Sequence, residues 1–109
     1  MAKYGNKKTV VDGITFDSKR EAARYQELKL LQKAGIIAGL ELQPKFELQP
    51  KFKKNEKTYK AITYKADFSY FEHGKRIIED VKGVVTQQFR LREKMFEYRF
   101  PFLELRIVR

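Results

Sequence analysis

The sequence predicts a single α/β domain, in which an N-terminal hairpin and a helix precede an antiparallel or mixed central sheet, a second helix and a last strand. Three observations carry this prediction: an Asp-Gly turn between short β-forming runs, helix-capping patterns at Ser18 and Thr86, and strand-like residues between the two expected helices. The chain has 109 residues, a length that supports one hydrophobic core. We therefore expect residues 1–109 to form one domain.

Residues 1–17 are expected to form an N-terminal arm and a hairpin. The strands Thr9–Val11 and Ile14–Phe16 flank Asp12 and Gly13. An Asp-Gly pair between β-forming residues favours a tight hairpin turn, because glycine tolerates the positive φ that the turn requires. The first six residues are predicted to be a loose basic arm.

A first helix is predicted to begin after Ser18. Ser18 and Glu21 stand three positions apart, as in a capping box, where a hydroxyl and a carboxylate satisfy free backbone amides. Helix-forming alanines and leucines follow, and Gly35 is a typical C-terminal stop.

The segment after this helix contains the hexamer ELQPKF twice in succession, at residues 41–46 and 47–52. Pro44 and Pro50 are incompatible with a helix interior or with a central position in a sheet. We therefore expect an edge strand or a bent pair of strands here, followed by a polar, lysine-rich turn at residues 53–60.

The second half of the chain is predicted to contain two strands, a helix and a last strand. Phe89, Phe96 and Phe100 form an apolar stripe at helical spacing, and Pro101 ends the helix. The expected elements are a strand at 61–71, a turn at His73-Gly74, a strand at 76–82, a helix opening at Thr86, and a strand at 102–108.

Composition narrows the classes of function. The 24 Lys and Arg residues outnumber the 14 Asp and Glu residues, for a formal charge of +10. This charge favours a polyanionic partner, nucleic acid first and an anionic membrane surface second. Without cysteine, a disulfide framework, a thiolate zinc site and a cysteine nucleophile are excluded. No apolar run approaches the roughly 18 residues of a membrane span, and the N-terminus does not read as a signal peptide, so we expect a cytoplasmic protein without a membrane segment.

Basic residues concentrate in the predicted polar turn and in the second helix. Solvated surface charge is the plainer interpretation, but at this net charge we expect part of it to contact DNA phosphates without reading sequence. The candidate DNA-binding residues are Lys53, Lys54, Lys57, Lys60, Arg90, Arg92 and Lys94.

The strongest candidates for catalytic residues lie in the segment Asp80-Val81-Lys82, on a predicted strand. Because side chains alternate along a strand, Asp80 and Lys82 share a face, and Glu79 points to the other. Asp67 lies on the preceding strand, which a turn can bring beside Asp80. Two carboxylates and an ammonium suit phosphodiester hydrolysis with Mg²⁺ or Mn²⁺, which prefer oxygen ligands. An ordinary ion-pair cluster of the same three residues is equally compatible with the sequence.

The order of these elements resembles the core of the PD-(D/E)xK nuclease superfamily, with its restriction-endonuclease-like fold. The resemblance spans residues 16–108, with Asp67 as the first acid and Asp80-Val81-Lys82 as the second motif. The sequence departs from the pattern where Ala66 replaces the name-giving proline and where the second acid is Asp rather than Glu. It is also similar to a family of short phage-encoded proteins thought to be nucleases, which implies the host cytoplasm as location.

Residues 16–22 resemble the start of the first helix in resolvase-like and transposase-type members, where a helical Glu completes the site. By this resemblance Glu21 is a third metal ligand, although helix capping explains it without catalysis. The resemblance also makes Gln88, at the start of the second helix, a candidate near the scissile phosphate, against the plainer interpretation of an exposed first-turn residue. His73, the only histidine, is expected in a solvated turn and is not assigned as a general base.

Together, these observations and the resemblance predict a Mg²⁺- or Mn²⁺-dependent DNA endonuclease. Asp67, Asp80 and Glu21 would hold the metal, and Lys82 would assist the attacking water. By analogy with junction resolvases, the substrate would be branched DNA, and cutting both strands would favour a homodimer. The alternatives are a non-catalytic, basic nucleic-acid-binding module whose acid cluster is structural, and a nuclease fold that has lost its activity.

Overall fold

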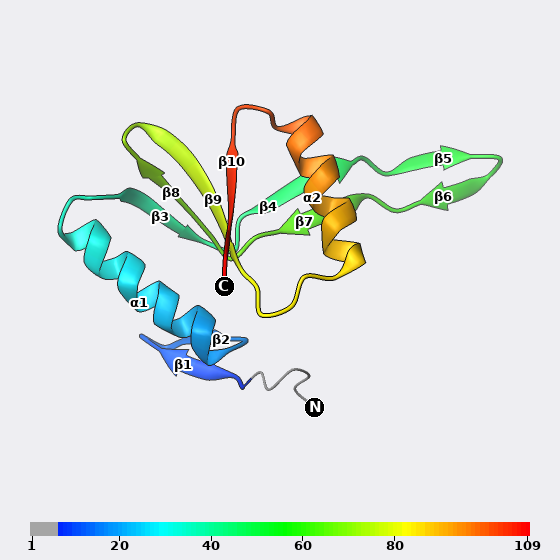
Figure 1. Cartoon of the computed structure of the whole chain (residues 1–109). Helices are drawn as coiled ribbons and strands as arrows, with labels where there is room; N and C mark the ends of the chain where they lie inside the picture. Colours follow the sequence, from blue (N-terminus) through cyan, green and yellow to red (C-terminus); the bar gives the residue numbers. More distant parts are fainter. Residues whose placement is uncertain (1–6) are drawn as a thin grey trace.

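The computed structural model describes residues 7–109 and has the predicted α/β architecture (Figure 1). The expected arm at residues 1–6 lies outside the described residues. The elements in chain order are β1 (Thr9–Val11), β2 (Ile14–Phe16), α1 (Lys19–Lys33), β3 (Ala38–Leu42), β4 (Lys45–Gln49), β5 (Phe52–Lys54), β6 (Lys57–Tyr59), β7 (Ile62–Lys65), β8 (Phe68–Glu72), β9 (Lys75–Val81), α2 (Gln87–Arg99) and β10 (Glu104–Val108).

The central sheet is mixed and has the strand order β10-β9-β8-β3. β8 and β9 form an antiparallel hairpin, and its turn holds His73 at a φ of 53°. β10 runs parallel to β9, which requires a crossover connection, and α2 supplies it. The sheet therefore separates α1 on one side from α2 on the other (Figure 1).

Each helix covers its own hydrophobic cluster. Tyr25 and Leu28 of α1 pack with Phe68 and Ile77 on one face, whereas Phe96 of α2 packs in a second cluster with Ile78. Successive residues of β9 thus enter opposite cores, as strand alternation requires. The same alternation governs the charged residues that follow them in β9.

The predicted helix boundaries are confirmed. The Ser18 hydroxyl accepts a hydrogen bond from the Glu21 backbone N–H at 3.1 Å, and Thr86 caps α2 in the same way through Phe89. Gly35 follows the end of α1 with a φ of 80°. Phe100, expected within the stripe of the second helix, is its C-cap residue.

Two strand predictions need correction. The single strand expected at 61–71 is divided into β7 and β8, because the chain changes partners there: Ala66 N–H donates to Pro44 O, and Asp67 N–H donates to Glu79 O. The polar turn expected at 53–60 is a β-hairpin, β5–β6, with its tight turn at Asn55 and Glu56.

The two hexamers form bent strands, as predicted. Pro44 and Pro50 each lie at a joint between strands, where the missing N–H breaks no ladder.

Candidate active site

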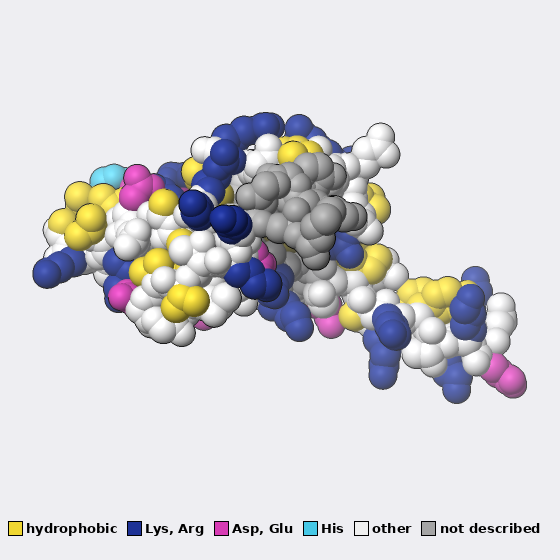
Figure 2. All heavy atoms as spheres, turned by 90° about the horizontal axis from the view of Figure 1, so that it is seen from below, with side chains coloured by type: hydrophobic (Ala, Val, Ile, Leu, Met, Phe, Trp, Pro, Cys, Tyr) yellow, Lys and Arg dark blue, Asp and Glu magenta, His cyan; other side chains and the backbone are white. Residues whose placement is uncertain are grey.

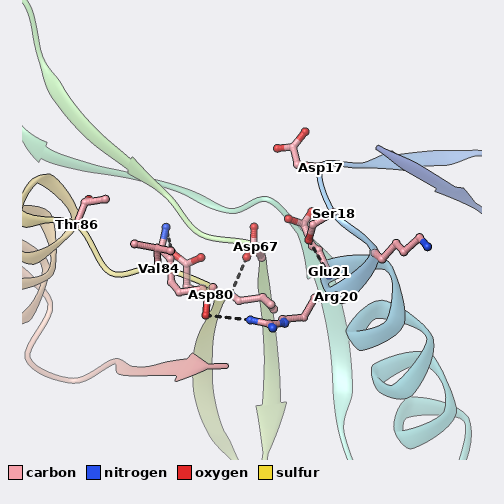
Figure 3. Close-up of a pocket in the computed structure, with 12 residues that line it drawn as sticks. Asp17, Ser18, Arg20, Glu21, Asp67, Asp80, Val84 and Thr86 are labelled. Carbon is pink, nitrogen blue, oxygen red and sulfur yellow. Dashed lines mark hydrogen bonds and ion pairs between the residues drawn. The ribbon is translucent and has the colours of Figure 1, made fainter. Parts of the chain in front are cut away.

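An open pocket of about 550 Å³ lies where the start of α1, the junction of β7 with β8, and the end of β9 meet (Figure 3). Glu21, Asp67, Asp80 and Lys82 all line it. The four residues that the sequence analysis expected to cooperate are therefore brought together, from positions up to 61 apart in the chain (82 − 21).

Asp80 is the most deeply buried acid of the pocket, with 2% of its surface exposed. The Tyr64 hydroxyl donates to its Oδ2 at 2.5 Å, and the Lys82 Nζ lies 3.6 Å from the same oxygen. Asp80 in β9 and Lys82, the residue after the end of β9, both lie on the α2 side of the sheet, because they are two positions apart on an extended chain.

Asp67 is fixed by backbone hydrogen bonds on two sides. Its N–H donates to Glu79 O at 3.1 Å, and its carbonyl accepts from Gln43 N–H at 2.9 Å. Its side-chain Oδ2 accepts from the Val81 N–H at 2.7 Å, and so occupies a position that a strand carbonyl would fill in a regular ladder. This arrangement sets the Asp67 carboxyl beside Asp80 (Figure 3).

The two aspartates hold their protons unusually tightly. Burial raises the pKa of Asp67 to about 6. Burial, reinforced by the negative charge of Asp67, raises the pKa of Asp80 to about 7. At neutral pH the two carboxyls are therefore only partly ionised, because the described side chains around them do not offset the cost of desolvating their charge.

Glu21 takes part in the helix cap through its backbone and lines the pocket with its side chain. Its backbone N–H takes part in the Ser18 cap, while its side chain is 7% exposed and turned into the pocket. Burial raises the pKa of Glu21, whereas its hydrogen bond with Asp67 opposes that rise. The carboxyl thus belongs to the same electrostatic group as the two aspartates.

Basic side chains line the pocket beside these acids. The Lys82 backbone N–H donates to Val108 O at 2.8 Å, and its Nζ lies 4.6 Å from the centre of the Phe89 ring. Arg20 also lines the pocket, where its Nη1 donates to the Lys82 carbonyl at 3.5 Å. Lys19 lines the pocket too and is exposed.

Two residues of this site were missed by the sequence analysis. Tyr64 was assigned to the sheet core, and its ring does pack there, but its hydroxyl binds Asp80. A buried tyrosine needs a partner for its hydroxyl, and this requirement is the signal that could have found it. For Arg20, the only signal in the sequence is its position next to Glu21.

The other candidates lie away from the carboxyl pair. Glu79 faces the α1 side, as expected, where Arg24 binds it through two nitrogens at 2.7 and 2.9 Å and the Tyr70 hydroxyl donates at 2.6 Å. Gln88 is exposed in the first turn of α2 and lines a neighbouring depression that shares Lys82 with the main pocket. His73 is exposed in its turn.

The carboxylate oxygens of this pocket suit a hard cation, such as Mg²⁺, that takes only one or two of its ligands from the protein. Between residues 7 and 109, no three Asp, Glu or His side chains are grouped so as to hold a metal ion by themselves. Mg²⁺ is commonly bound through one or two carboxylates, with water and phosphate oxygens completing the shell. The half-buried Asp67 and the buried Asp80, whose pKa values are raised, fit that type of site.

The predicted DNA-binding residues occupy two separate surfaces. Those of the hairpin are exposed on β5, β6 and the residue after them, in a segment that projects from the body of the molecule. On α2, Arg90 pairs with Glu93 at 3.2 Å and the Arg92 Nε donates to Thr63 O at 3.2 Å, whereas Lys94 is exposed.

Within the described part of the chain, no helix has the length and apolar character needed to cross a membrane.

The fold and the pocket define a small α/β protein with two neighbouring carboxyls, one buried and one half-buried, in an open pocket. The whole chain, residues 1–109, matches the family described as "Protein of unknown function (DUF1064)", and it belongs to this family. The chain matches no curated protein and no solved structure.

Proposed function

We propose that this protein is a metal-dependent DNA endonuclease of the PD-(D/E)xK type, which hydrolyses phosphodiester bonds. The observation that carries the proposal is the Asp67–Asp80 pair: a half-buried and a buried carboxyl whose pKa values are raised and which share an open pocket with Lys82. Burying like charges together is costly unless a cation compensates them, so the pair is better explained by a bound ion than by folding alone.

Asp67 and Asp80 would hold Mg²⁺ or Mn²⁺, with Glu21 as a further carboxyl at the same site. When bound, the ion supplies charge stabilisation at the phosphate and lowers the pKa of a coordinated water. Tyr64 donates to Asp80 and thereby fixes which carboxyl oxygen remains directed to the pocket. The backbone bonds of Asp67 restrict it in the same way.

Lys82 is the residue that would act on the nucleophile and the phosphate. Its ammonium lies 3.6 Å from Asp80 Oδ2, and its side chain is 29% exposed, so it can contact both the carboxyl pair and a substrate in the pocket. There the ammonium would orient the attacking water or neutralise the charge that develops on the phosphate oxygens, and the neutral amine would be the form able to take up the proton of the water.

The substrate is DNA because the chain is strongly basic and because Arg20 and Lys19 add positive charge beside the acids. The likeness to resolvase-like nucleases favours branched or junction DNA, and one site per chain favours a homodimer if both strands are cut. Gln88, close to Lys82 in the neighbouring depression, would lie beside the same DNA backbone.

The test is nicking of supercoiled plasmid and of a four-way junction, with Mg²⁺, Mn²⁺ or EDTA. Wild type should cleave only with metal, and Asp80→Asn and Lys82→Ala should each lose about 100-fold or more in rate. Glu47→Gln and Lys75→Ala, which change exposed residues outside the pocket, should cleave as wild type does.

Binding of DNA without cleavage in either metal would refute the nuclease proposal and favour a binding module with a structural acid cluster. Equal cleavage by wild type and Asp80→Asn would show that the assigned residues are wrong.

A further inference from the structure

The β5–β6 hairpin and its flanking residues, 51–60, form a projecting β5–β6 arm. All residues of both strands are exposed, and Figure 1 shows the arm extending beyond β4 and β7. It carries five lysines and one glutamate, and Figure 2 shows Lys and Arg side chains standing out around it at the right of the view. The arm is therefore a basic ribbon without a hydrophobic core of its own.

The pairing within the arm places two residues of like charge opposite each other. Lys54 and Lys57 are directly opposed across the two strands next to the turn, and like charges in this position destabilise a sheet. An isolated two-stranded hairpin is already marginal in water. A negatively charged partner that contacts both lysines would remove the repulsion.

One aromatic pair supports the arm. The rings of Phe52 and Tyr59 stack with centroids 4.7 Å apart and an interplanar angle of 8°, and the Lys57 Nζ lies over the Tyr59 ring at 5.1 Å. Because side chains alternate, these two aromatic residues share one face of the ribbon with Lys54 and Lys57. The aromatic pair thus orders the strands so that both lysines are presented together.

We propose that the β5–β6 arm is a binding element for double-stranded DNA, with the Lys54–Lys57 face in contact with the phosphodiester backbone. The inference rests on the proposed function and defines its substrate as a duplex, or as the duplex arms of a junction. A two-stranded ribbon has a size that the major groove admits. The Tyr59 ring contacts Phe52 and Lys57, so it is not a free platform for stacking unpaired bases, as single-strand binding requires.

A second copy of this chain is a poorer partner for the arm. Two arms in contact would each bring an excess of four positive charges (five lysines less one glutamate), and their repulsion opposes association. DNA has the complementary charge along its whole length. The longest dimension of the molecule is 53 Å, which corresponds to about 16 base pairs at 3.4 Å per pair.

The proposal is tested by fluorescence anisotropy in EDTA, with a labelled duplex of about 20 base pairs and a single strand of the same length. The variant Lys54→Gln/Lys57→Gln is compared with Lys29→Gln/Lys33→Gln, which removes the same charge from exposed positions on α1. The arm variant should lower the slope of log affinity against log salt by about 1.8 for the duplex, since each phosphate contact contributes about 0.9. The α1 variant should leave the slope unchanged.

A third variant separates the contribution of the arm's ordered structure to binding from that of its lysine charges. Phe52→Ala keeps every charge but removes the aromatic pair, and it should weaken duplex binding several-fold while its thermal unfolding stays close to that of wild type. Equal losses in the arm and α1 variants would overturn the proposal, as would a loss confined to the single strand.

These outcomes are independent of cleavage. If the arm variants bind the duplex as wild type does while wild type nicks DNA, the inference about the arm fails and the nuclease proposal stands. If binding depends on the arm but no metal supports nicking, the nuclease proposal fails and the arm remains a duplex-binding element.

Discussion

Replacing Asp80 by asparagine should stabilise the metal-free protein while removing its response to metal. The rise of the Asp80 pKa from 3.8 to about 7 corresponds to about 4 kcal/mol of unfavourable interaction in the ionised form, at 1.36 kcal/mol per pKa unit. Asparagine removes that charge, and its amide can still accept from Tyr64 and donate to Asp67, as a protonated Asp80 would.

The attraction to Lys82, at 3.6 Å, and the Tyr64 hydrogen bond both lower the pKa of Asp80, so their loss is already contained in this net figure. A stabilisation of up to about 4 kcal/mol is therefore expected, which is an increase of roughly 16 °C in Tm for a domain of this size.

The assay is thermal unfolding at about pH 8, followed by circular dichroism, in EDTA and across a Mg²⁺ titration. Wild type should unfold at lower temperature than Asp80→Asn in EDTA and should gain about 2.7 kcal/mol when Mg²⁺ reaches 100 times its Kd. The variant should gain much less. Glu47→Gln, at an exposed carboxylate outside the pocket, should follow wild type in both conditions. A lower Tm for Asp80→Asn in EDTA would refute the reasoning, because it would mean that the ionised carboxyl stabilises the fold.

Three further predictions follow from the same network of acids. Glu79→Gln should destabilise the protein by about 3 kcal/mol in urea unfolding, since it leaves Arg24 without its buried partner; an unchanged midpoint would contradict this. In EDTA, the free energy of unfolding should fall as pH rises from about 4 to about 7, because the folded state holds the protons of Asp67 and Asp80 more tightly than the unfolded chain does; a pH series in urea checks the sign, and Mg²⁺ should reduce the fall. The Tyr64 hydrogen bond lowers the pKa of Asp80, so Tyr64→Phe should raise that pKa and move the acidic limb of the pH profile of cleavage to higher pH. An unmoved limb would show that this hydrogen bond does not determine the pKa that the limb reports.

Local rules were enough to predict the arrangement of charges along β9. Strand alternation put Asp80 and Lys82 on one face and Glu79 on the other, and the structure has them so. The hairpin at Asp12-Gly13 and the helix capped by Ser18 were also predicted, since turn and cap signals act within a few residues.

The features that the sequence did not predict depend on distant partners. The break at Asp67 exists because its backbone pairs with Gln43 and Glu79, and no local signal marks it. The β5–β6 hairpin was read as a turn because its strands bury nothing, so hydrophobic alternation, the usual signal of a strand, is absent there.

Glu79 and Asp80 are consecutive, both buried, and treated differently by the fold. Glu79 receives two hydrogen bonds from Arg24 and one from Tyr70, so its charge is compensated. Among residues 7–109, Asp80 receives one hydrogen bond from Tyr64 and forms an ion pair with Lys82, although the chain carries ten more positive than negative charges. Arg20, at the same pocket, is directed to the Lys82 carbonyl rather than to a carboxyl. Within the described residues, the shortage of positive charge is therefore local to Asp67 and Asp80. A site built only for stability would be expected to pair them with a neighbouring arginine, as Arg24 pairs with Glu79 one residue away, and this contrast is what the proposed cation would explain.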